Sequence, residues 1–136
     1  MVELSETTTT MAGIFLLSLV TVESGGALLL KIARGTQPAT DIQRTFFRAG
    51  HAHAGVFLTL ALATQVFVDA ADLSGVPAVL ARSGVGAAAI LMPAGFFLSV
   101  VKPGSTKPSR VAVLIPIGAT VLAAGLVCLG IGLLVA

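Results

Sequence analysis

The sequence predicts an all-α, polytopic membrane protein, in which a single domain (residues 1–136) forms four transmembrane helices in an up-down bundle with both termini on the outer side. Three observations lead to this fold class. Hydrophobic residues make up 56% of the chain and charged residues 10%, whereas about a quarter of a soluble domain is charged. Four apolar segments approach or exceed the ~20 residues that a helix needs to cross a bilayer. Basic residues gather in two of the three loops between these segments.

We expect the four helices at about 11–33, 41–69, 84–102 and 109–135. A helix satisfies its own backbone hydrogen bonds in lipid, whereas a barrel would need about eight strands or more. The tail before the first segment contains acidic residues and no basic residue. The first segment is therefore predicted to span the membrane and not to be a cleaved signal peptide.

Local signals indicate where some of these helices begin. Thr40 and Gln43 have the spacing of a capping box, which predicts that the second helix starts near Asp41. The segment 76–82 follows a glycine and is expected to form a short, separate helix at the outer interface.

Three glycines in the fourth segment, Gly118, Gly125 and Gly132, recur every seven residues and share one stripe of the helix. Lipid provides no hydrophobic drive between helices, so close helix contacts rely on small residues. The stripe predicts packing against another helix of the same chain, with a seam between two copies of the chain as the alternative.

The charges near the loops predict the orientation. The first and third loops are mainly basic, and the second is mainly acidic. The residues are Lys31, Arg34, Asp41, Arg44 and Arg48 around the first loop, Asp69, Asp72 and Arg82 around the second, and Lys102, Lys107 and Arg110 around the third. The positive-inside rule then places the first and third loops in the cytoplasm of a multi-pass protein of the plasma (inner) membrane. Asp69 and Asp72 are interpreted as a solvated helix end, with a cation site as the alternative.

Both histidines of the chain, His51 and His53, lie in the segment 46–56, where the second helix enters the membrane. Ionisable groups at such depth are costly and are therefore a hint of function. At about 100° per residue, the two imidazoles point roughly 160° apart. One chain therefore cannot hold a metal ion or a haem between them on a regular helix, and each imidazole is expected to meet a different neighbour.

Glu23, near the middle of the first helix, is the expected partner of a histidine, because its depth differs from that of His53 by only ~4 Å at 1.5 Å per residue. A carboxylate in lipid should be protonated, paired or hydrated. Glu23 with His51 or His53 is therefore a candidate site for a proton, a metal ion or a cofactor, with a structural polar contact as the alternative. Arg48 is a further candidate for cofactor binding, and an interfacial anchor is its simpler interpretation.

Two sequence runs, FFRAGHAHAGV at 46–56 and ILMPAGFF at 90–97, also carry a resemblance. Together they resemble a family of small four-helix inner-membrane proteins from actinobacteria, over nearly the whole chain. The resemblance implies the four-helix topology and makes the histidine run a signature of that family. It implies no activity and no substrate.

The same sequence argues against several function classes. The net charge is +2 and the basic residues flank helices, so nucleic-acid binding is not expected. The chain has no nucleotide-binding loop, no nucleophile–base pair and no cysteine cluster. No catalytic residue is therefore predicted, and an enzyme is the less favoured reading.

The favoured function is that of a structural or accessory component of a membrane assembly, or of a homo-oligomer, with the lipid bilayer as its surroundings. It requires no cofactor. One alternative is a redox protein that binds haem or a metal ion through His51 and His53, with two chains sharing the cofactor. A second alternative is a proton- or ion-coupled transporter that uses Glu23 and the histidine pair.

Overall fold

A computed structural model describes residues 3–71 and 73–136. The elements follow one another along the chain as α1 (Glu6–Ala33), α2 (Asp41–Ala70), α3 (Gly75–Ser99), the 3₁₀ helix η1 (Arg110–Val113) and α4 (Leu114–Val135). The prediction of an all-α chain is thereby confirmed for the described residues. Each of the four long helices is long and apolar enough to cross a membrane.

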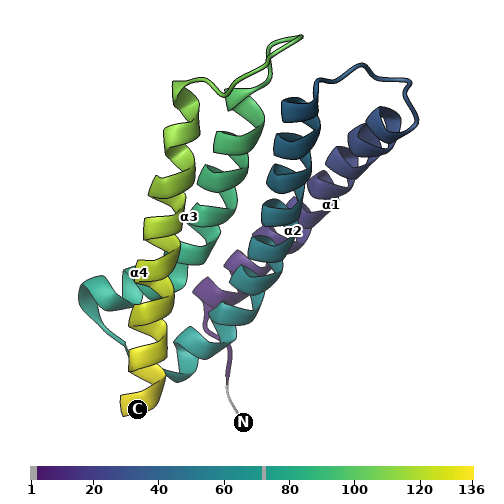
Figure 1. The fold of residues 1–136 in the computed structure, drawn as a ribbon. Helices are drawn as coiled ribbons and strands as arrows, with labels where there is room; N and C mark the ends of the chain where they lie inside the picture. Colours follow the sequence, from purple (N-terminus) through teal and green to yellow (C-terminus); the bar gives the residue numbers. More distant parts are fainter. Residues whose placement is uncertain (1–2, 72) are drawn as a thin grey trace.

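Consecutive helices run in opposite directions, so both termini lie at one end of the molecule (Figure 1). The connections 34–40 and 100–109 lie at the other end. The two middle helices, α2 and α3, pack on each other, while α1 packs on α2 and α4 packs on α3. Only 6% of the residues in the most apolar part of α1 are buried, against 39% in α3. Helix α1 is thus an open edge of the fold.

The capping box predicted at the start of α2 is present, with the Thr40 side chain accepting from the Gln43 backbone and the Gln43 side chain accepting from the Thr40 backbone. The separate helix expected over 76–82 is not formed, because this segment is the beginning of α3. Pro77 does not interrupt this helix, because it occupies the first turn of α3, where a backbone N–H has no partner within the helix and its loss costs little.

The glycine stripe of α4 packs within the chain, as predicted, with Gly118 and Gly125 against α3 and Gly132 against Leu73 of the α2–α3 connection. Gly118, Gly125 and Gly132 are all buried. A Cβ atom placed on Gly125 would lie 2.8 Å from the Leu80 carbonyl oxygen, and one on Gly84 would lie 2.9 Å from the Gly125 Cα atom. The two backbones therefore touch directly, and the stripe is not free to bind a second copy of the chain.

The buried apolar residues form two clusters along the middle helices. The first joins α1, α2 and α3 through residues that include Phe15, Leu58 and Val85. Phe15 reaches α3 because Gly86 leaves room for it, since a Cβ atom there would lie 3.0 Å from the Phe15 ring. The second cluster joins α2, α3 and α4 near the chain termini and includes Val68 and Leu129.

Candidate functional site

The imidazole of His51 lies against α1, at a place where that helix has no side chains. A Cβ atom on Gly25 would lie 3.1 Å from His51 Nδ1, and one on Gly26 would lie 3.5 Å from His51 Cε1. The two consecutive glycines thus make the space in which the ring is held. The His51 side chain is half-buried in this seam.

The imidazole of His53 faces α3 instead. Its ring centroid lies 4.9 Å from that of Phe96 in α3 and 5.3 Å from that of Phe57 in α2. His53 Nδ1 lies 2.7 Å from the Ala49 carbonyl oxygen. Because a carbonyl oxygen only accepts, Nδ1 carries the proton in this contact. The two histidines therefore meet different helices, as their spacing predicts.

Glu23 does not join either histidine, contrary to the expectation from depth. Its side chain is exposed, and no hydrogen bond or ion pair links it to His51 or His53 in the described residues. The reason is its position around the helix. The pair Gly25 and Gly26 marks the face of α1 that contacts α2, and Glu23 lies roughly 110° away from the middle of that pair at about 100° per residue. The structure thus separates the members of the proposed ionisable site.

Arg48 lies one turn before His51 along α2, with its side chain exposed. With Arg44 it lines a cavity of about 260 Å³ whose other walls are Leu29, Ile32 and Ala33 of α1. Arg48 therefore lies at the end of the α1–α2 seam, beyond the histidines and beside the basic loops.

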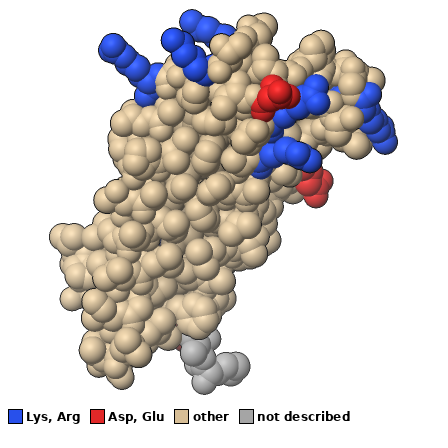
Figure 2. All heavy atoms as spheres, viewed as in Figure 1, with Lys and Arg blue, Asp and Glu red and all other residues tan. Residues whose placement is uncertain are grey.

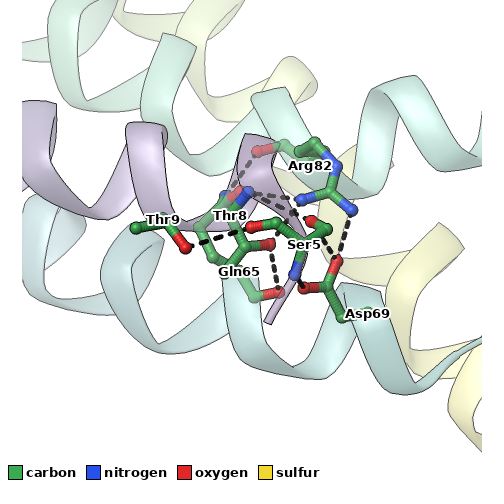
Figure 3. A network of polar contacts seen from close by, with 6 residues as sticks. All are labelled: Ser5, Thr8, Thr9, Gln65, Asp69 and Arg82. Atoms are coloured by element: carbon green, nitrogen blue, oxygen red, sulfur yellow. Dashed lines mark hydrogen bonds and ion pairs between the residues drawn. The ribbon is translucent and has the colours of Figure 1, made fainter. Parts of the chain in front are cut away.

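A polar network that the sequence analysis did not identify lies at the opposite end of the molecule (Figure 3). Arg82 of α3 forms an ion pair with Asp69 of α2, with Nη2 and Oδ1 2.7 Å apart. The Asp69 side chain is only 7% exposed and that of Arg82 is 25% exposed. The Asp69 end of α2 is therefore not a solvated helix end, nor is Asp69 free to bind a cation. Asp72 lies outside the described residues.

The same network holds the beginning of α1. The Ser5 backbone N–H and hydroxyl both donate to the Asp69 carboxylate, at 2.9 and 3.0 Å. Arg82 Nη1 donates to the hydroxyl of the buried Thr8 at 2.7 Å, and the fully buried Gln65 donates to the Arg82 carbonyl oxygen at 2.8 Å. Three helices thus meet through polar contacts. Two features of the sequence point to this network. Gln65 lies one turn before Asp69 in a largely apolar part of α2, and Arg82 is the single basic residue of the helix that follows.

A second polar contact joins the two loops at the basic end. The buried amide of Gln43 donates to the carbonyl oxygens of Val100 and Lys102, at 3.0 and 2.9 Å. The Thr40 hydroxyl donates to the Ser105 carbonyl oxygen at 2.6 Å. The residues of the capping box therefore also fasten the α3–α4 connection to α2. A capping pattern in a sequence gives no sign of this second role.

These positions limit what one chain can do chemically. Residues 3–71 and 73–136 contain no group of three or more His, Cys, Asp or Glu side chains that could hold a metal ion. The two imidazoles contact different helices, so a cofactor shared by His51 residues would require two chains. That hypothesis stays a prediction.

Comparison with known proteins gives no match to this chain, whether among family models, curated proteins or solved structures.

Proposed function

We propose that the protein is a multi-pass protein of the inner membrane that serves as a structural or accessory subunit, with the exposed face of α1 covered by a helix of another subunit. The general support is the character of the surface. Large apolar side chains are exposed on the outer faces of the helices, among them Leu17 of α1, Ile90 of α3 and Val127 of α4. Such faces are stable in lipid or against another apolar helix, and costly in water.

The distribution of charge supports an orientation with both loops of the basic end in the cytoplasm. Lysine and arginine side chains gather around the connections 34–40 and 100–109 (Figure 2). Within residues 3–71 and 73–136, Arg82 is the one basic residue at the other end, and Asp69 neutralises it. The positive-inside rule favours cytoplasmic placement for the end that carries the free basic charges. Both termini would then lie outside.

The observation that carries the subunit role is the exposed carboxyl group of Glu23 in the least covered helix. Three hydroxyl groups lie near it along α1, on Ser18, Thr21 and Ser24, but each donates to a carbonyl oxygen of α1 itself, at 2.6 to 2.8 Å. None of them therefore donates to Glu23. An acidic side chain at the centre of a spanning helix costs about 3 kcal/mol when it faces lipid. A polar group of a partner helix would remove much of this cost.

Cross-linking in native membranes tests this role. A photo-reactive amino acid at position 20, where Val20 is 62% exposed one turn before Glu23, should give a discrete protein adduct. The same amino acid at position 90, where Ile90 is 70% exposed on α3, serves as the matched control and should give mainly lipid adducts. The mass of the adduct distinguishes a second copy of this chain from another subunit.

The variants of Glu23 connect the adduct to the carboxyl group. Glu23→Leu should abolish the adduct at position 20, while Glu23→Gln, which keeps a hydrogen-bonding group, should retain it. Neither variant should change the thermal unfolding of the isolated chain much, because Glu23 has no hydrogen bond within the described residues. Lipid adducts alone at both positions would contradict the proposal.

A further inference from the structure

We infer that the cavity beside Arg44 and Arg48 is a binding site for an anionic phospholipid, with the phosphate on the two guanidinium groups and an acyl chain along the end of α1. The inference rests on the proposed placement in a membrane. It assigns a ligand to a part of the chain that the subunit role does not use.

The two guanidinium groups are available for an anion. Arg44 and Arg48 are four residues apart and so lie on the same side of α2. Both are exposed, and in the described part of the chain neither forms an ion pair with a carboxylate, Asp41 included. Arg44 Nε donates to the Ala39 carbonyl oxygen at 3.2 Å, which holds the side chain in place and leaves its terminal nitrogens free. Guanidinium groups match the oxygen geometry of a phosphate.

The opposite wall of the cavity is apolar, and this favours a lipid over a free phosphate ion. Leu29, Ile32 and Ala33 form that wall, and the cavity holds about 260 Å³. This volume exceeds that of a phosphate group and suits a headgroup with the first part of an acyl chain. A free phosphate would gain nothing from the three aliphatic side chains, whereas an acyl chain would pack against them.

The position of the cavity agrees with the same ligand. It lies between the last turns of α1 and the first turns of α2, at the end where the basic residues gather (Figure 2). Basic pockets between spanning helices on the cytoplasmic side are typical sites for acidic lipid headgroups. The larger neighbouring cavity, of about 590 Å³, shares Ile32 but has no lysine or arginine in its lining, so it lacks the means to hold an anion.

Thermal unfolding in a neutral detergent tests the site on the purified full-length chain. Dioctanoyl phosphatidylglycerol should raise the unfolding midpoint in a saturable manner, while dioctanoyl phosphatidylcholine, with the same acyl chains, and inorganic phosphate, with the anion alone, should have little effect. Arg44→Gln with Arg48→Gln should weaken the apparent affinity for phosphatidylglycerol by about tenfold or more. Lys107→Gln with Arg110→Gln removes the same charge from the same end, outside the cavity, and should leave the affinity near that of the wild type.

Three results would overturn the inference. Equal affinity in the two double variants would show that the lipid responds to surface charge in general. If phosphatidylcholine raised the unfolding midpoint as much as phosphatidylglycerol, the site would not distinguish the charge of the headgroup. If inorganic phosphate raised the midpoint as much, the site would bind a free anion. A chain that stays soluble and folded without detergent would instead refute the membrane placement, which separates the failure of that proposal from the failure of this one.

Discussion

The seam between α3 and α4 and the seam between α1 and α2 both use glycine, but for opposite purposes. In the α3–α4 seam, Gly84 and Gly125 bring the two backbones into direct contact, so no space remains. In the α1–α2 seam, Gly25 and Gly26 make room for the imidazole of His51. The same residue type therefore closes one interface and opens the other.

The difference indicates which part of the molecule is free to acquire a function. Close packing of small residues is the main source of stability between helices in lipid, so the α3–α4 seam is constrained along its length. The α1–α2 seam carries the half-buried His51 and a cavity at its basic end. Helix α1 is attached by the apolar cluster around Phe15 and, at the other end of the molecule from the cavity, by the polar network of Ser5, Asp69 and Arg82.

The largest expected effect comes from adding one methyl group to the closed seam. Gly125→Ala would place a Cβ atom 2.8 Å from a backbone oxygen, and two helices must then separate because no side chain can move aside. We expect a loss of about 3 kcal/mol in the free energy of unfolding, measured by detergent denaturation. Gly130→Ala on the same helix is the matched control. It meets no atom within 4 Å and should be neutral or stabilising by up to about 1 kcal/mol.

If both glycine variants of α4 behaved alike, the backbone contact would not be the source of stability, and the contrast between the seams would disappear.

A second, smaller effect is expected where the open seam is fastened. Arg82→Met leaves the Asp69 carboxylate without its ion pair and Thr8 without a donor, while the aliphatic part of the side chain is kept. Because Arg82 is partly exposed, we expect the free energy of unfolding to fall by about 2 kcal/mol, which is less than the effect of breaking a fully buried ion pair. Hydrogen exchange should rise mainly in the first turns of α1 and leave the amides of α3 and α4 protected.

The control for this variant is Arg110→Met, which removes an exposed arginine that has no ion pair in the described ranges. It should change neither the unfolding free energy nor the exchange of α1. Uniform loss of protection over all four helices in Arg82→Met would mean that the network stabilises the whole fold equally, and that α1 is not attached separately.

Features that depend on residues close together in the sequence could be predicted from it. The four apolar segments, the capping box at Thr40 and the seven-residue spacing of Gly118, Gly125 and Gly132 are all local patterns, and the structure contains each of them. The beginning of α3 was misplaced because the segment 76–82 was interpreted as a separate helix, whereas it forms the first turns of α3. A proline in the first turn is compatible with one continuous helix.

The candidate site was predicted less well, because it depends on how one helix is rotated against another. The expected depths of Glu23 and His53 are similar, but depth contains no information on the face of α1 that turns toward α2. The pair Gly25 and Gly26 contained that information, since small residues tend to mark the contact face. The network around Arg82 was not predicted for the same reason. Its residues come from three helices, and the sequence does not show how these helices are rotated against one another.

The smallest expected effect tests the open seam itself. Gly25→Ala would place a Cβ atom 3.1 Å from His51 Nδ1, but the neighbouring atom belongs to a side chain, so the ring can shift. We expect a change below about 1 kcal/mol in the unfolding free energy, and we expect His51→Ala to abolish that cost in a double-mutant cycle. Gly13→Ala in the same helix meets no atom within 4 Å and should show no coupling to His51. If Gly25→Ala cost as much as Gly125→Ala, or if its cost persisted without the imidazole, the α1–α2 seam would be as closed as its counterpart and the space around His51 would have no bearing on function.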